Sequence, residues 1–206
     1  MGTTKLLRKI EMAEFIEEVE AAVKDGALAV AHIDLDDFKG INDEFGHQVG
    51  DQVLESWERT LKGSVPKEAI VERVGGDEYI VALPDHTAES ALIVLEEIRE
   101  HFASRFPTKD VPRRCNVSVG IAARPPHASG LSELLQAAYA AQARAKREGR
   151  GRVAIYAEEK MVMKTNYYSR AALDRLAKLS DHTGRTEASL LREAADDLFT
   201  KYRDLM

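Results

Sequence analysis

Apolar residues follow two patterns along the first three quarters of the chain, one with a helical period and one of short continuous runs. In residues 10–23, Ile10, Phe15, Val19 and Val23 fall close to helical spacing, which predicts an amphipathic helix. The uninterrupted apolar run over residues 27–33 predicts a buried central strand. The same criteria predict helices over residues 38–45, 88–106 and 131–146, a helix carrying Val53, Leu54, Trp57 and Leu61 on one face, and strands over residues 69–74, 79–83, 116–122 and 152–156.

These elements alternate along the chain, with one exception where two strands follow each other directly. Gly75-Gly76-Asp77-Glu78 separates that pair and predicts a hairpin turn, while Gly46 is placed to end the helix over residues 38–45. Strands alternating with helices, together with one hairpin, predict an α/β (α+β) domain in which helices pack on a mixed sheet.

The pattern changes after Tyr156. Residues 161–168 have extended character, and residues 170–180 and 186–202 read as two amphipathic helices separated at Gly184. We therefore divide the chain into a first domain over residues 1–157 and a small second module over residues 158–206.

Composition narrows the class of protein. The 206 residues are 44% hydrophobic and 31% charged, and no apolar run approaches the roughly 20 residues that span a bilayer. No signal-peptide pattern is found, so we expect a cytoplasmic protein without a membrane partner. The single cysteine, Cys115, lies in a predicted strand and is expected to be a buried, inert thiol.

The distribution of charge along the chain does not indicate a nucleic-acid-binding protein. The formal net charge is -6, and residues 158–206 contain nine basic and nine acidic residues, so neither part of the chain is basic.

Candidate chemistry begins at the end of the first predicted strand. Strand alternation places Asp34 and Asp36 on one face, and carboxylates gathered at a strand end commonly hold a hard cation such as Mg²⁺. Asp77 and Glu78 form a second acidic site on a turn whose glycines allow a ligand close to the backbone. If the hairpin adjoins the first strand, Asp34, Asp77 and Glu78 converge, and metal-assisted phosphoryl transfer follows.

Structural interpretations of both motifs remain open at this point. Asp37 can act as the N-cap of the helix over residues 38–45, and a Gly-Gly-Asp hairpin is a common β-turn.

Three blocks of sequence resemble the diguanylate cyclase (GGDEF) family. They are DLDDFKGINDEFGHQVGD over residues 34–51, RVGGDEY over residues 73–79 and AKREGR over residues 145–150, in the family's order and spacing. The resemblance covers roughly residues 12–157. It implies a palm-like nucleotidyl cyclase fold and an enzyme that condenses two GTP molecules into cyclic di-GMP, releasing pyrophosphate, with Mg²⁺ or Mn²⁺ and as a dimer.

The resemblance also assigns roles to single residues. Asp77, Glu78 and Lys39 are implied to be catalytic, with Asp77 or Glu78 helping to deprotonate the attacking 3′-hydroxyl and Lys39 steadying the triphosphate. The implied metal ligands are Asp34, the Leu35 carbonyl, Asp77 and Glu78. The implied substrate-binding residues are Asn42 and Asp51 at the guanine edge, His47 in the same pocket, Lys146 and Arg150 on phosphate oxygens, and Phe38, Gly75 and Gly76.

Simpler roles exist for the weaker members of this set. Lys146 and Arg150 close a predicted helix, where cations complement the helix dipole without any ligand, and His47 follows a helix-ending glycine as an ordinary loop residue does. An aspartate at position 51 accepts from the guanine N1–H and N2–H₂ groups, which favours GTP over ATP.

The chain departs from the family pattern in three places. TTKLLRKIEM over residues 3–12 replaces the usual opening Asp-x-Leu-Thr-Gly-Leu-x-Asn-Arg motif, which puts the usual N-terminal packing in question. Pro66 and Ala69 occupy the positions of the Arg-x-x-Asp product-inhibition motif, so feedback at that site is not expected. Tyr139 and Ala143 stand where the family prefers Asp and Tyr.

The second module resembles the ribbon-helix-helix family: a short strand, a helix, Gly184-Arg185-Thr186 and a longer helix, with Thr186 as the helix N-cap. A single short strand needs a second copy to pair with, which implies a homodimer. In the DNA-binding version Met163, Thr165 and Tyr167 face the bases; in the alternative, favoured by the balanced charge, the module only dimerises.

Two alternatives to the cyclase function stay open. A related cyclase, similar to CRISPR-polymerase-like enzymes, would make a different cyclic dinucleotide. A non-catalytic regulator would bind GTP in the first domain and DNA through the second module.

Overall fold

The computed structural model describes residues 2–23, 26–127, 130–157, 168–184 and 186–202. The chain forms two compact units, Met1–Glu158 and Glu159–Met206. Each unit is described by itself below.

The first unit is built on a five-stranded mixed sheet with the strand order β2-β3-β1-β4-β5. The strands are β1 (Leu28–Leu35), β2 (Ile70–Arg73), β3 (Glu78–Pro84), β4 (Val117–Arg124) and β5 (Val153–Ile155). β1 pairs antiparallel with both β3 and β4, and only β4 and β5 are parallel. Every residue of β1 is buried, as the continuous apolar run predicts for a central strand.

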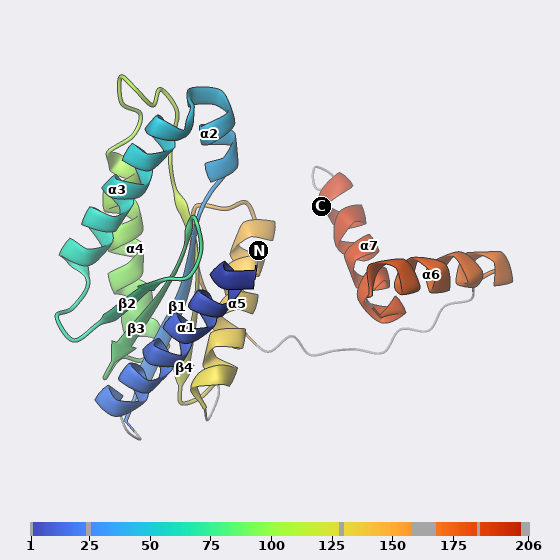
Figure 1. Cartoon of the computed structure of the whole chain (residues 1–206), viewed down its shortest axis with the longest axis horizontal. Coiled ribbons are helices and arrows are strands. Elements are labelled where there is room, and N and C mark those ends of the chain that lie inside the picture. The colour runs from blue at the N-terminus through green and yellow to red at the C-terminus, as the bar shows by residue number, and fades with distance from the viewer. Residues whose placement is uncertain (1, 24–25, 128–129, 158–167, 185, 203–206) are drawn as a thin grey trace. The chain divides into compact units, whose positions relative to one another are not determined.

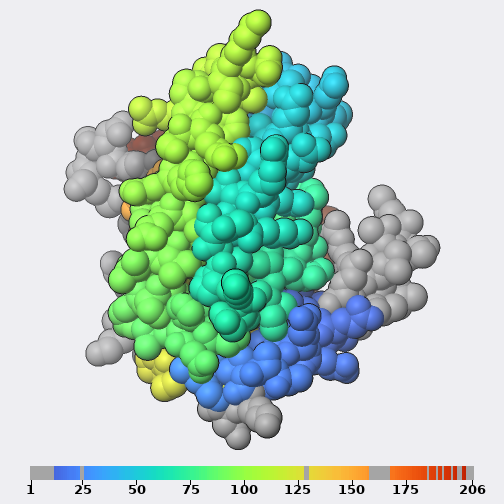
Figure 2. Space-filling model, turned by 90° about the vertical axis from the view of Figure 1, so that its left-hand side faces the viewer, coloured from blue at the N-terminus to red at the C-terminus, as the bar shows by residue number. Residues whose placement is uncertain are grey.

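Helices cover both faces of this sheet (Figure 1). The helices of this unit are α1 (Gly2–Val23), α2 (Phe38–Phe45), α3 (His47–Ser64), α4 (Ala88–Ser104) and α5 (Leu131–Arg147). α3 and α4 lie on one face, where Figure 2 shows them side by side. α1 and α5 lie on the other face, with α5 against β4 and β1. The prediction of a mixed sheet with packed helices is confirmed.

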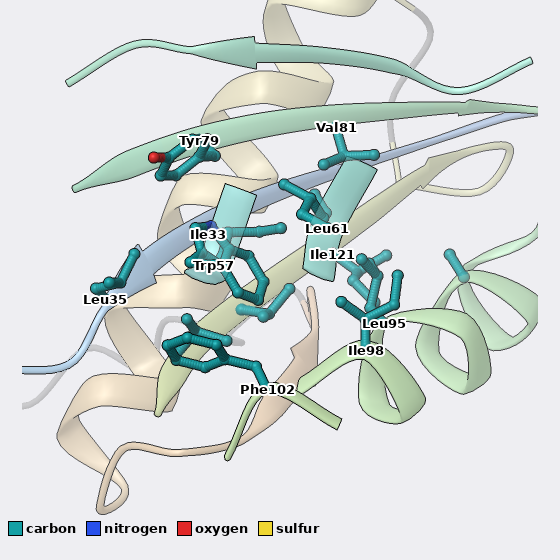
Figure 3. Packing of buried hydrophobic residues seen from close by; sticks show 14 of the residues in the cluster. Ile33, Leu35, Trp57, Leu61, Tyr79, Val81, Leu95, Ile98, Phe102 and Ile121 are labelled. Carbon is teal, nitrogen blue, oxygen red and sulfur yellow. The ribbon is translucent and has the colours of Figure 1, made fainter. Parts of the chain in front are cut away.

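An aromatic cluster fills the core between the sheet and the helices α3 and α4 (Figure 3). The Trp57 ring meets Phe102 at 5.2 Å and Tyr79 at 6.2 Å between ring centroids, both edge to face. Such pairs add to the stabilisation that comes from burying their large apolar area. The cluster fixes α3 against β3 directly behind the turn that carries Asp77 and Glu78.

α5 lies unusually close to β4 at Gly120. An ideal Cβ built there would lie 2.0 Å from the backbone nitrogen of Gln142 and 2.2 Å from the backbone carbonyl oxygen of Ala138. Only glycine therefore permits this contact between helix and strand. The contact holds the C-terminal half of α5, including Lys146, over the end of β1.

The N-terminal helix packs on the sheet although its opening sequence departs from the family pattern. Phe15, Val19 and Val23 of α1 are buried with Val30 of β1 and Leu134 of α5. The helix also begins earlier than its apolar periodicity predicts, at Gly2 instead of Ile10.

The second unit contains the two predicted helices, α6 (Arg170–Thr183) and α7 (Glu187–Lys201). α6 starts at Ser169, whose side chain accepts a hydrogen bond from the Ala172 N–H, and ends at Gly184, which has a φ of 64°. The predicted strand lies outside the described residues except for its last member, Tyr168, so the interpretation of Met163, Thr165 and Tyr167 stays untested. In the part of the chain that the structure describes, no helix is both long and apolar enough to traverse a bilayer.

Candidate active site

The ends of β1 and β3 bring together the two predicted acidic sites. Asp34 stands directly opposite Glu78 in the antiparallel register. One step further, the Leu35 N–H donates to the Asp77 carbonyl at 3.2 Å. Because residues paired across two strands project to the same face, Asp34 and Glu78 share one side of the sheet. The hairpin therefore adjoins the first strand, as the predicted convergence of Asp34, Asp77 and Glu78 requires.

Asp34 is a buried carboxylate with a cation beside it. The residue is 6% exposed, and its Oδ1 lies 2.6 Å from the Lys146 ammonium at the end of α5. Burial raises the pKa of the Asp34 carboxyl; the Lys146 ammonium opposes that rise, and the charges of Asp77 and Glu78 add to it. Repulsion from two neighbouring carboxylates shows that negative charge is in excess here.

This excess fits a divalent cation. Asp34 contacts one ammonium while the charges of Asp77 and Glu78 act on it. Carboxylate and carbonyl oxygens are the ligands that Mg²⁺ and Mn²⁺ prefer. Among the described residues, no three histidine, cysteine or carboxylate side chains are already gathered as a cation cage. The Asp34 oxygen that would contact such an ion meets the Lys146 ammonium instead.

Asp36, the second carboxylate of the strand end, has a structural role. Its Oδ1 accepts from the Ser118 hydroxyl at 2.6 Å and its Oδ2 from the Gly151 N–H at 2.8 Å. Both oxygens are thereby occupied, which ties the loop after β1 to β4 and to the segment after α5.

Asp37 does not cap α2, so the capping interpretation is wrong. The residue has a φ of 55°, and its side chain makes no hydrogen bond to the first turn of the helix. The carboxylate turns instead to Arg113, whose Nη2 lies 2.6 Å away, while Nη1 of the same arginine reaches Glu44 at 3.3 Å. In Figure 2 the loop that carries Arg113 (lime) stands beside α2 (light blue). The start of α2 is left without a side-chain cap, beside Asp34.

Arg73 braces the turn between β2 and β3. Its guanidinium donates to the Gly75 carbonyl at 3.2 Å and to the Gly76 carbonyl at 2.5 Å, and it pairs with Glu58 of α3 at 3.0 Å. The Tyr79 hydroxyl donates to the same Glu58 carboxylate at 2.9 Å. Because one guanidinium group binds both carbonyls, it fixes the backbone of the turn that carries Asp77 and Glu78.

The turn itself does not need both of its glycines. A Cβ at Gly76 would have open space around it, and a Cβ at Gly75 would meet only the flexible Glu78 side chain, at 2.7 Å. Neither residue has a positive φ. The bare backbone at Gly76 therefore leaves room for a group from outside the chain.

The candidate guanine-binding residues meet where α2 joins α3. A Cβ at Gly50 would lie 2.0 Å from the Asn42 Oδ1 and 3.4 Å from the Phe38 ring, so these two side chains rest against the first turn of α3. Asp51 follows Gly50 directly and is exposed, as are His47 at the start of α3 and Lys39 in the first turn of α2. Gly46 ends α2 with a φ of 85° and sets the angle between the helices.

Lys146 precedes the end of α5 and Arg150 follows it. Lys146 is in the last turn of the helix, which ends at Arg147. Arg150 has a φ of 61°, and its N–H donates to the Ala145 carbonyl at 3.0 Å. The side chain of Arg150 lines a cavity together with Asp36 and Asp37. Lys146 thus contacts the end of β1, and Arg150 shares a cavity lining with the loop that follows.

His32 of β1 and Tyr139 of α5 are two polar residues that lie close to Asp34. His32 lies on the same face of β1 and is buried; burial, reinforced by the Lys146 charge, lowers its pKa to about 4. Its ring meets the edge of Tyr139 on α5, at 5.2 Å between centroids. Tyr139, which replaces the family's usual Asp, therefore packs behind the Asp34–Lys146 pair.

Sequence reasoning gave no role to Arg73, Arg113 or Ser118, which hold the site's loops in place. Arg73 lies inside the quoted RVGGDEY block, so its position beside the turn was a usable signal. No local pattern marks Arg113 or Ser118, because their partners Asp37 and Asp36 are distant in sequence.

Comparison with known proteins gives the same family. The model of the family described as "Diguanylate cyclase, GGDEF domain" matches residues 2–152. The chain is 35% identical over 155 residues to the diguanylate cyclase DgcP of Pseudomonas aeruginosa, covering 74% of this chain and 23% of that protein. It is 32% identical over 164 residues to the cyclic di-GMP phosphodiesterase PdeR of Escherichia coli, covering 76% of this chain and 24% of that protein.

Solved structures agree. The active GGEEF domain of a diguanylate cyclase from Vibrio cholerae superimposes with a TM-score of 0.65 at 29% identity, covering 71% of this chain and 94% of that one. The GGDEF domain of DgcB from Caulobacter crescentus, in complex with c-di-GMP, gives 0.63 at 32% identity, covering 72% and 90%.

The chain spans about a quarter of the length of these two curated relatives, and the family match ends at residue 152, before α6 and α7. Within that match lie all three sequence blocks and the acidic site at the ends of β1 and β3. The chain belongs to the GGDEF family of diguanylate cyclase domains.

Proposed function

We propose that the first domain is a diguanylate cyclase that condenses two GTP molecules into cyclic di-GMP and releases pyrophosphate. The observation that carries this proposal is the meeting of Asp34 with Glu78 and Asp77 at the strand ends, beside Lys146 and the uncapped start of α2. Excess negative charge suits a metal ion, while a helix start without a side-chain cap suits phosphate.

Each residue of the site has a distinct task in this proposal. Asp34, the Leu35 carbonyl, Asp77 and Glu78 would hold Mg²⁺ or Mn²⁺, which when bound offsets the negative charge of the triphosphate. Lys39 and Arg150 bind phosphate oxygens, and Lys146 joins them by exchanging its contact with Asp34 for a contact with phosphate. Glu78 or Asp77 accepts the proton of the attacking 3′-hydroxyl.

Base selection is assigned to the junction of α2 and α3. The Asn42 amide both donates and accepts hydrogen bonds, whereas the Asp51 carboxylate only accepts, which complements the guanine N1–H and N2–H₂. Phe38 packs beside Asn42, and the exposed His47 begins α3. The open space at Gly76, with Gly75 before it, admits the nucleotide to the turn.

Product identification tests this function. The pure protein is incubated with Mg²⁺ and GTP, ATP or both, and the products are identified by mass. We expect cyclic di-GMP from GTP alone, its loss in Asp77→Asn, and no change in Asp110→Asn, which alters an exposed aspartate outside the site. A mixed or adenine dinucleotide would favour the related-cyclase alternative. GTP binding without product would favour the non-catalytic regulator.

For the second module we propose a ribbon-helix-helix-like dimerisation unit whose partner is a second copy of this chain. No residue of α6 is buried, and Leu173, Leu179, Leu191 and Leu198 of the two helices are exposed within the unit. Apolar residues at this density on two adjacent helices are typical of a face that another chain covers. A second copy fits better than DNA, because the module's basic and acidic residues are equal in number.

Molar mass in solution tests this second proposal. We expect the whole chain to be a dimer and a chain ending at residue 157 to be a monomer at the same concentration, both measured by light scattering. A tight dimer of the shortened chain would contradict it. Salt-dependent binding of duplex DNA by the whole chain would favour the DNA-binding version.

A further inference from the structure

A cavity of about 630 Å³ opens beside the proposed triphosphate site. It is lined by the loop after β1, by the segment before β4 and by the segment after α5, including Asp37, Arg113, Arg114, Asn116, Arg150 and Gly151. Its volume is in the range of cavities that hold small ligands. The loop after β1 connects the cavity to Asp34, and Arg150 belongs to both places.

Most polar groups of the lining already have partners within the chain. Asp36 accepts from Ser118 and Gly151, and Asp37 is paired with Arg113. The Asn116 side-chain oxygen accepts from Arg99 and from the Val117 N–H. These bonds hold the walls of the cavity in place without using its two remaining cations.

Arg114 and Arg150 are those two cations. Both are exposed, and neither guanidinium has an ion pair or side-chain hydrogen bond within the described ranges. The lining carries three arginines against two aspartates, and both aspartates are engaged. Unpaired guanidinium groups around a polar cavity bind oxyanions, and their planar forks suit phosphate in particular.

Deepening the proposed cyclase function, on which this inference rests, we propose that Arg114 acts with Arg150 to bind the terminal phosphates of GTP and the pyrophosphate that leaves. The 3′-oxygen forms a bond to the α-phosphorus while the bond from that phosphorus to the bridging oxygen breaks. The electron pair stays on pyrophosphate, and the hydroxyl proton passes to Glu78 or Asp77. Charge that develops on the leaving group then faces Arg114.

The test measures binding of inorganic pyrophosphate by calorimetry in the presence of Mg²⁺, with the whole chain. Arg114→Ala removes an exposed side chain, so folding is expected to be unaffected. We expect pyrophosphate and GTP to bind about tenfold more weakly, which corresponds to the loss of one charge-assisted hydrogen bond, and GMP to bind as before. Lys109→Ala, which removes a cation from the same loop outside the cavity lining, is the matched control and is expected to change none of the three affinities.

A double-mutant cycle adds a second readout. Arg150→Asn removes the other guanidinium while tolerating the positive φ at that position. If both arginines contact one ligand, their separate losses of pyrophosphate affinity do not multiply in the double variant.

Unchanged pyrophosphate affinity in Arg114→Ala, or an equal loss in Lys109→Ala, would overturn the inference. Failure of the proposed cyclase function can be distinguished from failure of this phosphate site. A whole chain that makes no cyclic di-GMP but binds pyrophosphate through Arg114 retains this site, whereas an active cyclase whose Arg114→Ala variant binds pyrophosphate normally lacks it.

Discussion

Cys115 lies just before β4, 2% exposed, and burial raises the pKa of its thiol to about 11. At pH 8 the thiolate fraction is about a tenth for an unperturbed thiol of pKa 9 and about a thousandth here. We expect Ellman's reagent to modify the folded protein at least ~100-fold more slowly than the protein in urea. Modification within seconds in the absence of urea would show that the thiol is accessible.

The same shift makes stability depend on pH in the alkaline range. The pKa of the thiol is higher in the folded state than in the unfolded state, so the folded state favours the neutral thiol. Below pH 9 the thiol is neutral in both states, and the full free energy of unfolding is present. The free energy of unfolding falls as the pH rises from 9 towards 11, by up to about 3 kcal/mol from a shift of about two units. Urea unfolding of the wild type and of Cys115→Ala at pH 8 and pH 10 checks this: the wild type is expected to lose more stability between the two pH values.

Single residues of the site differ in how well sequence reasoning placed them. Local rules predict the hairpin that carries Asp77 and Glu78. Its pairing with the strand of Asp34 was only a condition in the sequence, and the register of β1 and β3 supplies it. The partners of Asp36 and Asp37 could not be predicted, because Ser118 and Arg113 lie 82 and 76 positions away in sequence. Only the packed sheet and the loop after α4 bring those partners within reach.

At the scale of elements, the contact between α5 and β4 depends on Gly120. In Gly120→Ala the new methyl group would meet the α5 backbone, and backbone cannot move aside as a flexible side chain can. We expect a loss of about 2–3 kcal/mol in the free energy of unfolding, measured by urea titration. Gly130→Ala at the start of the same helix is the control: its Cβ would meet nothing, so a comparable loss there would refute the explanation.

The signature turn depends on Arg73 in a different way. Arg73→Lys keeps the charge but cannot hold two carbonyls and a carboxylate with one fork. Because the Arg73–Glu58 pair is partly exposed, we expect stability to fall by less than about 1 kcal/mol. Cyclic di-GMP formation is expected to fall at least ~10-fold, since the turn presents both proposed catalytic carboxylates. Arg59→Lys on α3 is the matched control, and an equal loss of activity there would argue against a positioning role for Arg73.

Element boundaries were predicted best where backbone chemistry marks them. α2 spans residues 38–45 as predicted, because Gly46 adopts a positive φ that ends the helix. α4 ends at Ser104 and not at Phe106, because a residue that precedes proline disfavours helical backbone. α1 extends beyond its apolar stripe because helix formers such as Lys5, Leu6 and Leu7 continue the helix without needing that stripe.

At the scale of the whole molecule, the chain joins a GGDEF domain to a second unit that the family match does not reach. Two helices could be predicted there from amphipathic spacing, and the structure has both. What packs on their apolar residues could not be predicted from local pattern, because an apolar stripe does not identify what covers it.

The two proposals together predict how activity depends on protein concentration. If two GTP-loaded domains must meet, a chain ending at residue 157 should show a specific activity that rises in proportion to its concentration. The whole chain should keep a constant specific activity on dilution, because linking two domains through the second unit raises their effective concentration to about the millimolar range. Cyclic di-GMP formation per mole of protein, measured over a hundredfold dilution, compares the two.

A pair of neighbouring substitutions on α7 separates this effect from the simple loss of a segment. Leu198→Asp places a charge on an exposed apolar position, and we expect it to behave like the shortened chain, whereas Asp197→Asn should behave like the wild type. A buried charge costs several kcal/mol in a dimer contact, while an exposed one costs little. If both variants and the shortened chain kept a constant specific activity on dilution, the GGDEF domains would associate through their own surfaces, and the second unit would have another partner.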